Sequence, residues 1–324
     1  MRLSLNTYSL AYAAGFFRAN GHPIKYPRPE CFLTLVQQSG LKSLEIPLDK
    51  YFGSLNTSLA DDFFIKAEGV GINIFPCIEN FNLQFLIENM PKFKEYGMKM
   101  IRIKMPHLGP TFYGGNRYSS DHFPKSLESF KLQLNHLDPV LEQFGCSVAI
   151  ENHQDLDLPE LVSLCESSEP SCRYITWDVG NSLSTMRMPH EFVEKAARWI
   201  ANIHMKDYRV FECERGFALS RCELGKGIIP ASEVISSTKH MPRLENISME
   251  LAAHPDRICD YKDPNYTKAF SHDGDEIHQF SEYLSTIISC NERRACTASG
   301  DDLIALEIEQ SLSSCQTLRD LFYA

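Results

Sequence analysis

The sequence predicts a (β/α)8 TIM barrel with a C-terminal helical extension. Short apolar runs typical of buried strands alternate with longer helical patterns, and eight such pairs follow one another along the 324 residues. Repeated strand-then-helix units favour parallel pairing, and eight of them close naturally into a barrel. An open, doubly wound sheet is the alternative, but no glycine-rich phosphate fingerprint follows the first strand.

The eight predicted strands are short apolar runs between polar or turn-forming residues. The chain begins with the first of them, because apolar and polar side chains alternate from Leu3 to Asn6. In order, the predicted strands span residues 3–6, 43–47, 72–76, 100–105, 147–151, 175–178, 200–204 and 247–250.

The eight predicted helices lie between or after these strands. Several begin with a proline in the first turn and end at a glycine, such as Gly40, Gly97 and Gly145, which is the expected chemistry of helix starts and stops. They span residues 29–39, 58–68, 83–96, 125–144, 159–166, 189–201, 230–239 and 276–289.

A linker and one further helix follow the barrel. We expect residues 1–290 to form the barrel and residues 291–324 the extension, because 291–300 is polar and 301–321 has helical periodicity. The apolar face of this helix must pack either on the barrel wall or across an interface, in a homo-oligomer or with a small second subunit. That face consists of Ile304, Ile308, Leu312, Cys315 and Leu318.

Composition excludes several classes of function. The chain has 32 Lys and Arg against 42 Asp and Glu, a net charge of −10, which argues against a nucleic-acid or anionic membrane partner. No apolar run approaches the roughly 20 residues that span a bilayer. Eleven cysteines without CxxC spacing fit neither a disulfide framework nor a zinc knuckle. We therefore expect a cytoplasmic protein with reduced thiols and a small-molecule ligand.

Four successive predicted strands end in residues that commonly bind metals: Glu151, Asp178, His204 and Glu250. The C-terminal ends of barrel strands face the active site, so these side chains should converge. Taken singly, each has a structural explanation as a surface carboxylate, a helix cap or a core histidine. Together, charged groups at the ends of buried strands are costly unless paired or metal-bound. The set suits one divalent ion, Mn²⁺, Mg²⁺, Co²⁺ or Zn²⁺.

Around these residues the sequence resembles the xylose isomerase-like TIM barrels, a superfamily of sugar isomerases, ketose 3-epimerases and related enzymes. The resemblance implies that the four residues hold one divalent ion, commonly Mn²⁺. It also implies that Glu151 and Glu250 act as an acid/base pair on a sugar through a metal-stabilised enediolate. The segments that carry it are residues 150–153, 177–181, 203–207 and 249–251, within a match that extends from residue 3 to about residue 289.

Departures from the family pattern point to a second reading. Asn181 and Val210 stand where the ketose 3-epimerases tend to have a substrate-binding histidine and an arginine, although Arg209 is adjacent. Endonuclease IV also needs a metal-binding histidine where Asn181 stands, which argues against DNA repair. Residues 216–219 and 223–227 look more like the branch of 3-oxo-isoapionate decarboxylases and C-glycoside deglycosidases. That likeness implies a lyase acting on a 3-keto sugar or sugar acid, with His153 as candidate acid or base.

Candidate substrate-binding residues lie next to the predicted metal ligands. A barrel that has lost catalysis, serving as a sugar-binding or partner subunit, is a third hypothesis, and the intact set of four ligand residues argues against it. Glu45 and Glu79, which follow or end strands, could bind hydroxyls or cap helices. The candidates for carbohydrate binding are His107, Asn181, Lys206, Asp207 and Arg209, with Tyr113 and Arg117 on the loop after the fourth strand.

Overall fold

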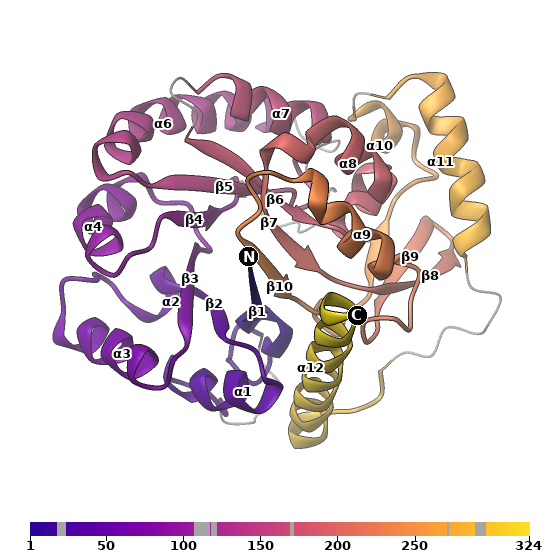
Figure 1. The fold of residues 1–324 in the computed structure, drawn as a ribbon. Coiled ribbons are helices and arrows are strands. Elements are labelled where there is room, and N and C mark those ends of the chain that lie inside the picture. The colour runs from indigo at the N-terminus through magenta and orange to yellow at the C-terminus, as the bar shows by residue number, and fades with distance from the viewer. Residues whose placement is uncertain (18–23, 107–116, 118–121, 169–171, 271, 289–295) are drawn as a thin grey trace.

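Eight parallel strands of the described chain close into a barrel, as predicted (Figure 1). The computed structural model describes residues 1–17, 24–106, 117, 122–168, 172–270, 272–288 and 296–324. Around the barrel the strand order is β1-β10-β7-β6-β5-β4-β3-β2. The bounds are β1 (Arg2–Asn6), β2 (Ser43–Pro47), β3 (Asn73–Ile78), β4 (Met100–Ile103), β5 (Ser147–Glu151), β6 (Arg173–Asp178), β7 (Ile200–Met205) and β10 (Asn246–Met249).

Helices surround the barrel, and local capping chemistry fixes where they begin. The side chains of Asn82 and Thr57 accept hydrogen bonds from first-turn amides, and Asp157 and Asp273 form capping boxes. The helices between or after the barrel strands are α1 (Cys31–Ser39), α2 (Leu48–Tyr51), α3 (Ser58–Gly69), α4 (Leu83–Glu95), α6 (His122–Phe144), α7 (Leu158–Glu166), α8 (Pro189–Ala196), α9 (Ala231–Ser237), α10 (Pro264–Lys268) and α11 (Gly274–Ile287).

The predicted helix over residues 189–201 was too long. The α-helix α8 ends at Ala196, a short 3₁₀ turn covers Ala197–Trp199, and β7 begins at Ile200. The reason is that Ile200 and Ala201 pair with the neighbouring strands inside the barrel wall, and this pairing overrides their compatibility with a helix.

A three-stranded antiparallel sheet, absent from the sequence prediction, stands beside the barrel. It consists of β8 (Tyr208–Cys213), β9 (Gly216–Arg221) and β11 (Arg257–Cys259) in the order β11-β9-β8. Gly216 at the β8–β9 turn has φ +147°, and a Cβ there would lie 2.4 Å from the Cys259 carbonyl oxygen, so only glycine fits. The sheet packs its apolar face against α10 and α11.

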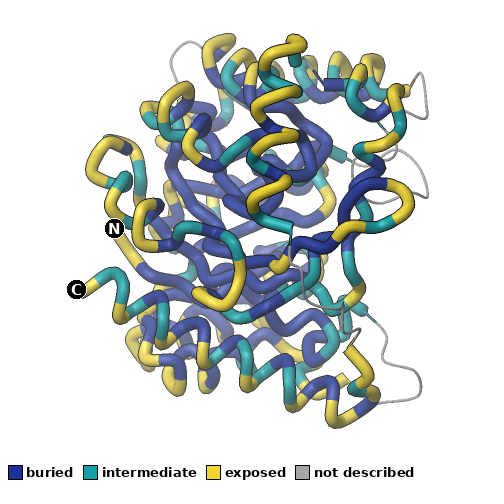
Figure 2. Tube along the Cα trace, turned by 90° about the vertical axis from the view of Figure 1, so that its right-hand side faces the viewer, coloured by how far each residue is buried: buried dark blue, intermediate teal, exposed yellow. Residues whose placement is uncertain are grey.

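The interior of the barrel is apolar at one end and polar at the other. Phe75, Met100, Ala149, Tyr174 and Ala201 form a separate small apolar cluster near the N-terminal ends of their strands. Alternation along each strand then places polar and charged side chains in the next interior layer, toward the C-terminal ends. Figure 2 shows the strands buried and the outward helix faces exposed.

The C-terminal helix α12 (Gly300–Tyr323) packs on its own barrel rather than standing apart. It contacts α1, α9, β10 and the 3₁₀ turn η1 (Thr7–Leu10), and it lies beside α1 and β10 in Figure 1. Its buried face includes Leu303, Ile304, Cys315 and Leu318. Of the two packing partners that the sequence left open, the barrel wall is therefore the one observed.

Two further observations concern the chain as a whole. Among the described residues, no helix combines the length and the apolarity needed to cross a bilayer. The ten cysteines in the described part of the chain are free thiols, and most are buried.

Candidate metal centre

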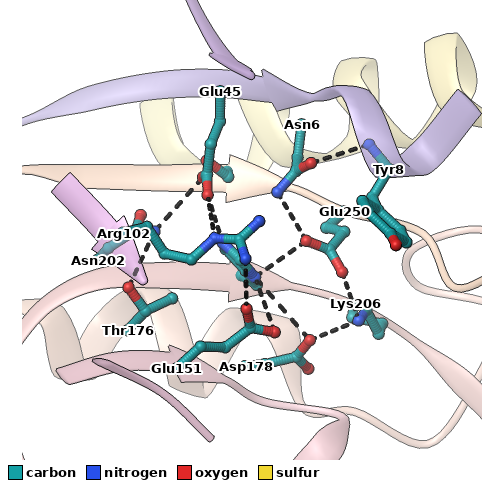
Figure 3. Close-up of polar contacts among 12 residues, drawn as sticks. Asn6, Tyr8, Glu45, Arg102, Glu151, Thr176, Asp178, Asn202, Lys206 and Glu250 are labelled. Carbon is teal, nitrogen blue, oxygen red and sulfur yellow. Dashed lines mark hydrogen bonds and ion pairs between the residues drawn. The ribbon is translucent and has the colours of Figure 1, made fainter. Parts of the chain in front are cut away.

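The four residues predicted to bind a metal lie together at the C-terminal end of the barrel. Glu151 ends β5, Asp178 ends β6, His204 lies in β7, and Glu250 directly follows β10. Each offers one ligand atom, and these four atoms all lie within 4.8 Å of one another. All four side chains are buried. Figure 3 shows the three carboxylates facing a common centre from different strands.

His204 is oriented by Glu45 on the opposite side of its ring. The Glu45 carboxylate accepts a hydrogen bond from His204 Nε2 at 2.9 Å, so Nδ1 is the ring nitrogen that faces the other carboxylates. Nδ1 lies 3.0 Å from Glu250 Oε2 and 3.7 Å from Glu151 Oε1. Burial alone would lower the pKa of His204, but Glu45 and Glu250 hold that pKa well above its ordinary value, so without a cation Nδ1 carries a proton. No hydrogen bond satisfies Nδ1, although it is fully buried.

This arrangement fits a divalent cation. A buried, unpartnered ring nitrogen beside three carboxylates gives one borderline and three hard donors, a set that Mn²⁺, Mg²⁺, Co²⁺ and Zn²⁺ accept. Without a cation, a proton has to occupy the position on Nδ1 that the cation would take. Glu45 supplies the outer carboxylate that metal-binding histidines commonly have.

Two buried cations hold the carboxylates in place. Arg102 of β4 lies 3.0 Å from Glu151 and 3.1 Å from Glu45. Lys206 bridges Asp178 and Glu250, and its ammonium lies 2.6 Å from Glu250 Oε1. Asn6 adds a hydrogen bond of 2.6 Å to the other oxygen of Glu250 (Figure 3).

These contacts keep two of the carboxylates ionised. Burial alone would raise the pKa of Glu250, but Lys206 and His204 hold that pKa well below its ordinary value. Burial also opposes ionisation of Glu151, yet Arg102 and His204 lower its pKa. For Asp178 burial prevails over the attraction of Lys206, and its pKa is raised. At neutral pH Glu151 and Glu250 are therefore available to bind a cation or to accept a proton.

A cavity of about 510 Å³ opens beside the four residues. Glu250 lines it together with His153, the candidate acid or base of the lyase reading. Tyr8 and Glu79 also line it, and the Tyr8 hydroxyl donates to Glu79 at 3.1 Å. A small molecule in this cavity would contact one candidate metal ligand directly.

The predicted substrate-binding residues occupy different places. Lys206 contacts two of the candidate metal ligands, as described above. Asn181 is buried; its backbone N–H donates to Asp178, and its amide oxygen accepts from Gln154 and Arg257. Asn181 therefore links Asp178 to Arg257, which lines the cavity, while Asn181 is not among the lining residues that the structure describes.

Asp207 and Arg209 point away from the cluster. Both carboxylate oxygens of Asp207 accept backbone N–H bonds from the turn that follows β9, at Gly225, Gly227 and Ile229, and from Tyr208. Arg209 is exposed and donates to the carbonyl of Lys226. The structure thus gives Asp207 the role of holding the turn at residues 225–229.

The remaining predicted residues follow β4 in the sequence. Arg117 pairs with Glu160 at the start of α7 and donates to two backbone carbonyls. His107 and Tyr113 lie outside the described residues.

Sequence reasoning missed several side chains of the centre. Arg102 and Lys104 were not singled out, although both interrupt the apolar run from Met100 to Met105 at alternate positions. Charged residues at alternate positions of a buried strand point to the barrel interior, so the signal was present. Asn6 carried no comparable signal, because an asparagine at a strand end commonly caps the next turn, as it also does here.

Comparisons with known proteins agree with the fold. No family model matches this sequence. A segment of 113 residues is 27% identical to the 3-oxo-isoapionate decarboxylase of Pectobacterium atrosepticum. That segment covers 34% of this chain and 41% of the decarboxylase, so the likeness spans about two fifths of that protein.

Solved structures resemble the chain over most or all of its length. A D-psicose 3-epimerase determined with D-fructose is 12% identical, covers 100% of both chains and has a TM-score of 0.57. The IolI protein with a bound zinc atom is 14% identical, covers 89% of this chain and 100% of its own, and has a TM-score of 0.52. These likenesses show that the chain has the same TIM-barrel fold as these two proteins.

Proposed function

We propose that this protein is a divalent-metal-dependent sugar isomerase or epimerase in which Glu151 and Glu250 transfer protons. The observation that carries the proposal is the convergence of Glu151, Asp178, His204 and Glu250 around the unpartnered Nδ1 of His204. The sugar-processing enzymes that share the fold support a carbohydrate substrate.

In this proposal the four residues hold one divalent ion. We propose Mn²⁺, with Zn²⁺ as the alternative that the zinc-bound IolI structure supports. When bound, the ion would supply Lewis-acid stabilisation of negative charge on a substrate oxygen. Glu45 keeps the proton of His204 on Nε2, which leaves Nδ1 free for the ion.

Glu151 and Glu250 are suited to proton transfer on a substrate beside them. Both are ionised, and they come from strands three positions apart in the barrel, with Glu151 on β5 and Glu250 after β10. One removes a proton from the carbon next to the carbonyl, and a proton is returned to the neighbouring carbon or to the other face. A positioned general base typically contributes about 10²–10⁴-fold to such a step.

Other side chains hold these two carboxylates in position. Arg102 holds Glu151, while Lys206 and Asn6 hold the two oxygens of Glu250. The cations compensate the charge of the carboxylates and leave their remaining lone pairs available.

A lyase is the second candidate. The likeness to the 3-oxo-isoapionate decarboxylase favours it, and His153 in the cavity wall is placed to donate or accept a proton. In a decarboxylation the bond to the carboxylate breaks, CO₂ leaves, and the bonding electron pair stays on the carbon next to the carbonyl until that carbon accepts a proton. In loss of an aglycone a base removes the proton next to the carbonyl, and the aglycone leaves with the electron pair of its bond and takes up a proton.

Proton exchange in D₂O, followed by NMR with Mn²⁺-loaded protein, tests the proposal. The panel contains ketoses, 3-keto sugars and 3-keto sugar acids, and the variants are Glu250→Gln and Glu151→Gln. Deuterium next to the carbonyl with an intact skeleton is expected for the wild type. The exposed Glu166→Gln serves as control and should exchange normally.

Metal content measured on the same samples separates lost binding from lost proton transfer. Release of CO₂ or of an aglycone would replace the isomerase reading by the lyase reading. A metal-loaded wild type that exchanges and cleaves nothing would contradict both.

A further inference from the structure

Three cationic side chains line the cavity beside the candidate metal centre. Lys50 lies in α2, which follows β2; Lys104 directly follows β4; and Arg257 begins β11. They come from three separate parts of the chain, so only the fold brings them to one cavity. The carboxylates among the described lining residues are Glu79 and Glu250.

Both lining carboxylates already have cationic partners of their own. Glu79 pairs with Lys104 and also lies 3.5 Å from Arg102. Glu250 pairs with Lys206, which is buried. A divalent ion at the candidate centre would add two further positive charges next to Glu250.

Lys50 is the cation whose charge is directed to the cavity. Its ammonium lies 4.5 Å from the centre of the Phe16 ring and 5.5 Å from that of Tyr8, and both rings line the same cavity. Among the ion pairs that the described residues form, none includes Lys50. Lys104 lies 5.9 Å from the same Tyr8 ring, so the two ammonium groups flank one aromatic surface.

From this arrangement we infer that the substrate carries an anionic group, a carboxylate or a phosphate, that binds at Lys50 and Lys104 in the cavity that Glu250 also lines. The inference rests on the proposed function, since it names the class of substrate for the same cavity. Charge-assisted hydrogen bonds from the two ammonium groups would hold the anion, while the carbonyl end of the molecule reaches Glu250. Arg257, which donates to the neutral amide of Asn181 at 2.6 Å, adds to the positive potential of the cavity.

Binding calorimetry on Mn²⁺-loaded protein tests this inference without requiring turnover. The probes are D-fructose, D-fructose 6-phosphate and 5-keto-D-gluconate, which are neutral, phosphorylated and carboxylated. At least one anionic probe should bind about 10- to 100-fold more tightly than D-fructose, the range expected for a hydrogen bond to a charged group. The tighter of the two anions identifies phosphate or carboxylate as the natural group.

Charge variants connect the effect to Lys50. Lys50→Met keeps the alkyl stem and should abolish the preference for the anion, whereas Lys50→Arg should retain it. Lys42→Met is the matched control, because Lys42 is an exposed lysine just before β2, at the opposite end of that strand. Equal binding of neutral and anionic probes, or an unchanged preference in Lys50→Met, would overturn the inference.

The outcomes keep the inference apart from the proposed function. Anion binding that depends on Lys50, in a protein that exchanges no proton of any sugar, would uphold the inference and contradict the function. Turnover of neutral ketoses, with a KM that is unchanged in Lys50→Met, would uphold the proposed function and contradict the inference.

Discussion

Glu45 accepts hydrogen bonds from His204 Nε2, Arg102 and Ser248, all inside the barrel. It touches neither the cavity nor the other candidate metal ligands directly. Its effect on the centre is to select the tautomer of His204 and to fix the ring. The contacts of Glu45 that support His204 are therefore as specific as the arrangement of the four ligand residues themselves.

We expect Glu45→Gln to weaken metal binding about 10- to 100-fold, the range observed when such outer partners are removed. The amide keeps the size of the side chain but gives His204 a weaker, neutral acceptor. Mn²⁺ titration followed by calorimetry measures the effect, with the exposed Glu166→Gln as control. An unchanged affinity would show that Glu45 does not govern His204.

Arg102 forms ion pairs with three buried carboxylates, those of Glu45, Glu79 and Glu151. Arg102→Met should lower the free energy of unfolding by about 3–5 kcal/mol, because the carboxylates would remain buried without their cation. Arg102→Lys keeps the positive charge, so its free energy of unfolding should lie between those of Arg102→Met and the wild type. Urea unfolding measures these changes.

The control for Arg102 is Arg198→Met. Arg198 pairs with Glu166 at the surface, where its side chain is 67% exposed, and such pairs contribute about 0–1 kcal/mol. If Arg102→Met and Arg198→Met cost the same, the buried network around Arg102 contributes nothing to stability.

At the scale of elements, α12 ties together two loops at the mouth of the barrel. Glu307 on its buried face accepts hydrogen bonds from the backbone N–H groups of Tyr12 and Ala13, in the segment after β1. Arg221 of β9 donates to the carbonyls of Ser9 and Ala252. Ser9 follows Tyr8 in the sequence, and its hydroxyl accepts a hydrogen bond from the backbone N–H of Leu251, the residue after Glu250. The extension thereby supports the two walls of the cavity.

Glu307 makes the docking of α12 dependent on pH. Burial raises its pKa from 4.5 to about 7, although Arg221 opposes the shift. Because the folded pKa lies above the unfolded one, stability is fully present below about pH 4.5 and is lost as the pH rises through 7. Between pH 5 and pH 8 the wild type should lose about 2 kcal/mol relative to Glu307→Gln, which does not titrate.

Unfolding by urea at several pH values checks this prediction. The difference between wild type and Glu307→Gln should grow toward high pH, while Glu309→Gln, on the exposed face of the same helix, should parallel the wild type. A constant difference across the range would mean that Glu307 is ionised throughout.

The added sheet shows where element prediction from sequence failed. Strands β8 and β9 lie between β7 and α9, inside what the eightfold pattern treats as one connection. Their alternation, as in Tyr208-Arg209-Val210, is too short to separate a strand from a loop. Their pairing with each other and with β11, some 40 residues later, stabilises them, and this is a tertiary contact.

At the scale of the whole molecule, a metal held at the ends of four strands should raise the free energy of unfolding. A ligand that binds only the folded protein adds about 2.7 kcal/mol at a concentration of one hundred times its Kd. Mn²⁺ should therefore raise the unfolding free energy of the wild type, and chelation should reverse the gain. Asp178→Asn should respond much less.

Thermal and urea unfolding with and without Mn²⁺ measure this coupling. Asp62→Asn, an exposed change of the same kind on α3, should respond as the wild type does. An equal response of Asp178→Asn and wild type would place metal binding elsewhere in the molecule.

The sequence by itself determined the order of the eight barrel strands, most helix bounds and the four residues at the strand ends. These features are local, because apolar periodicity and capping act over a few residues. A charged residue that follows a predicted buried strand can likewise be identified from the sequence alone. Barrel closure then converts four positions on successive strands into one cluster.

Only the tertiary structure decided which partner each polar residue finds. Lys206 reaches Asp178 and Glu250 rather than its neighbour Asp207, which instead holds a turn formed by residues 225–229. Glu45 meets Arg102 and His204, which come from strands far from it in the sequence. Such pairings depend on the direction in which each side chain leaves its strand and on the closure of the barrel, and these are properties of the folded chain.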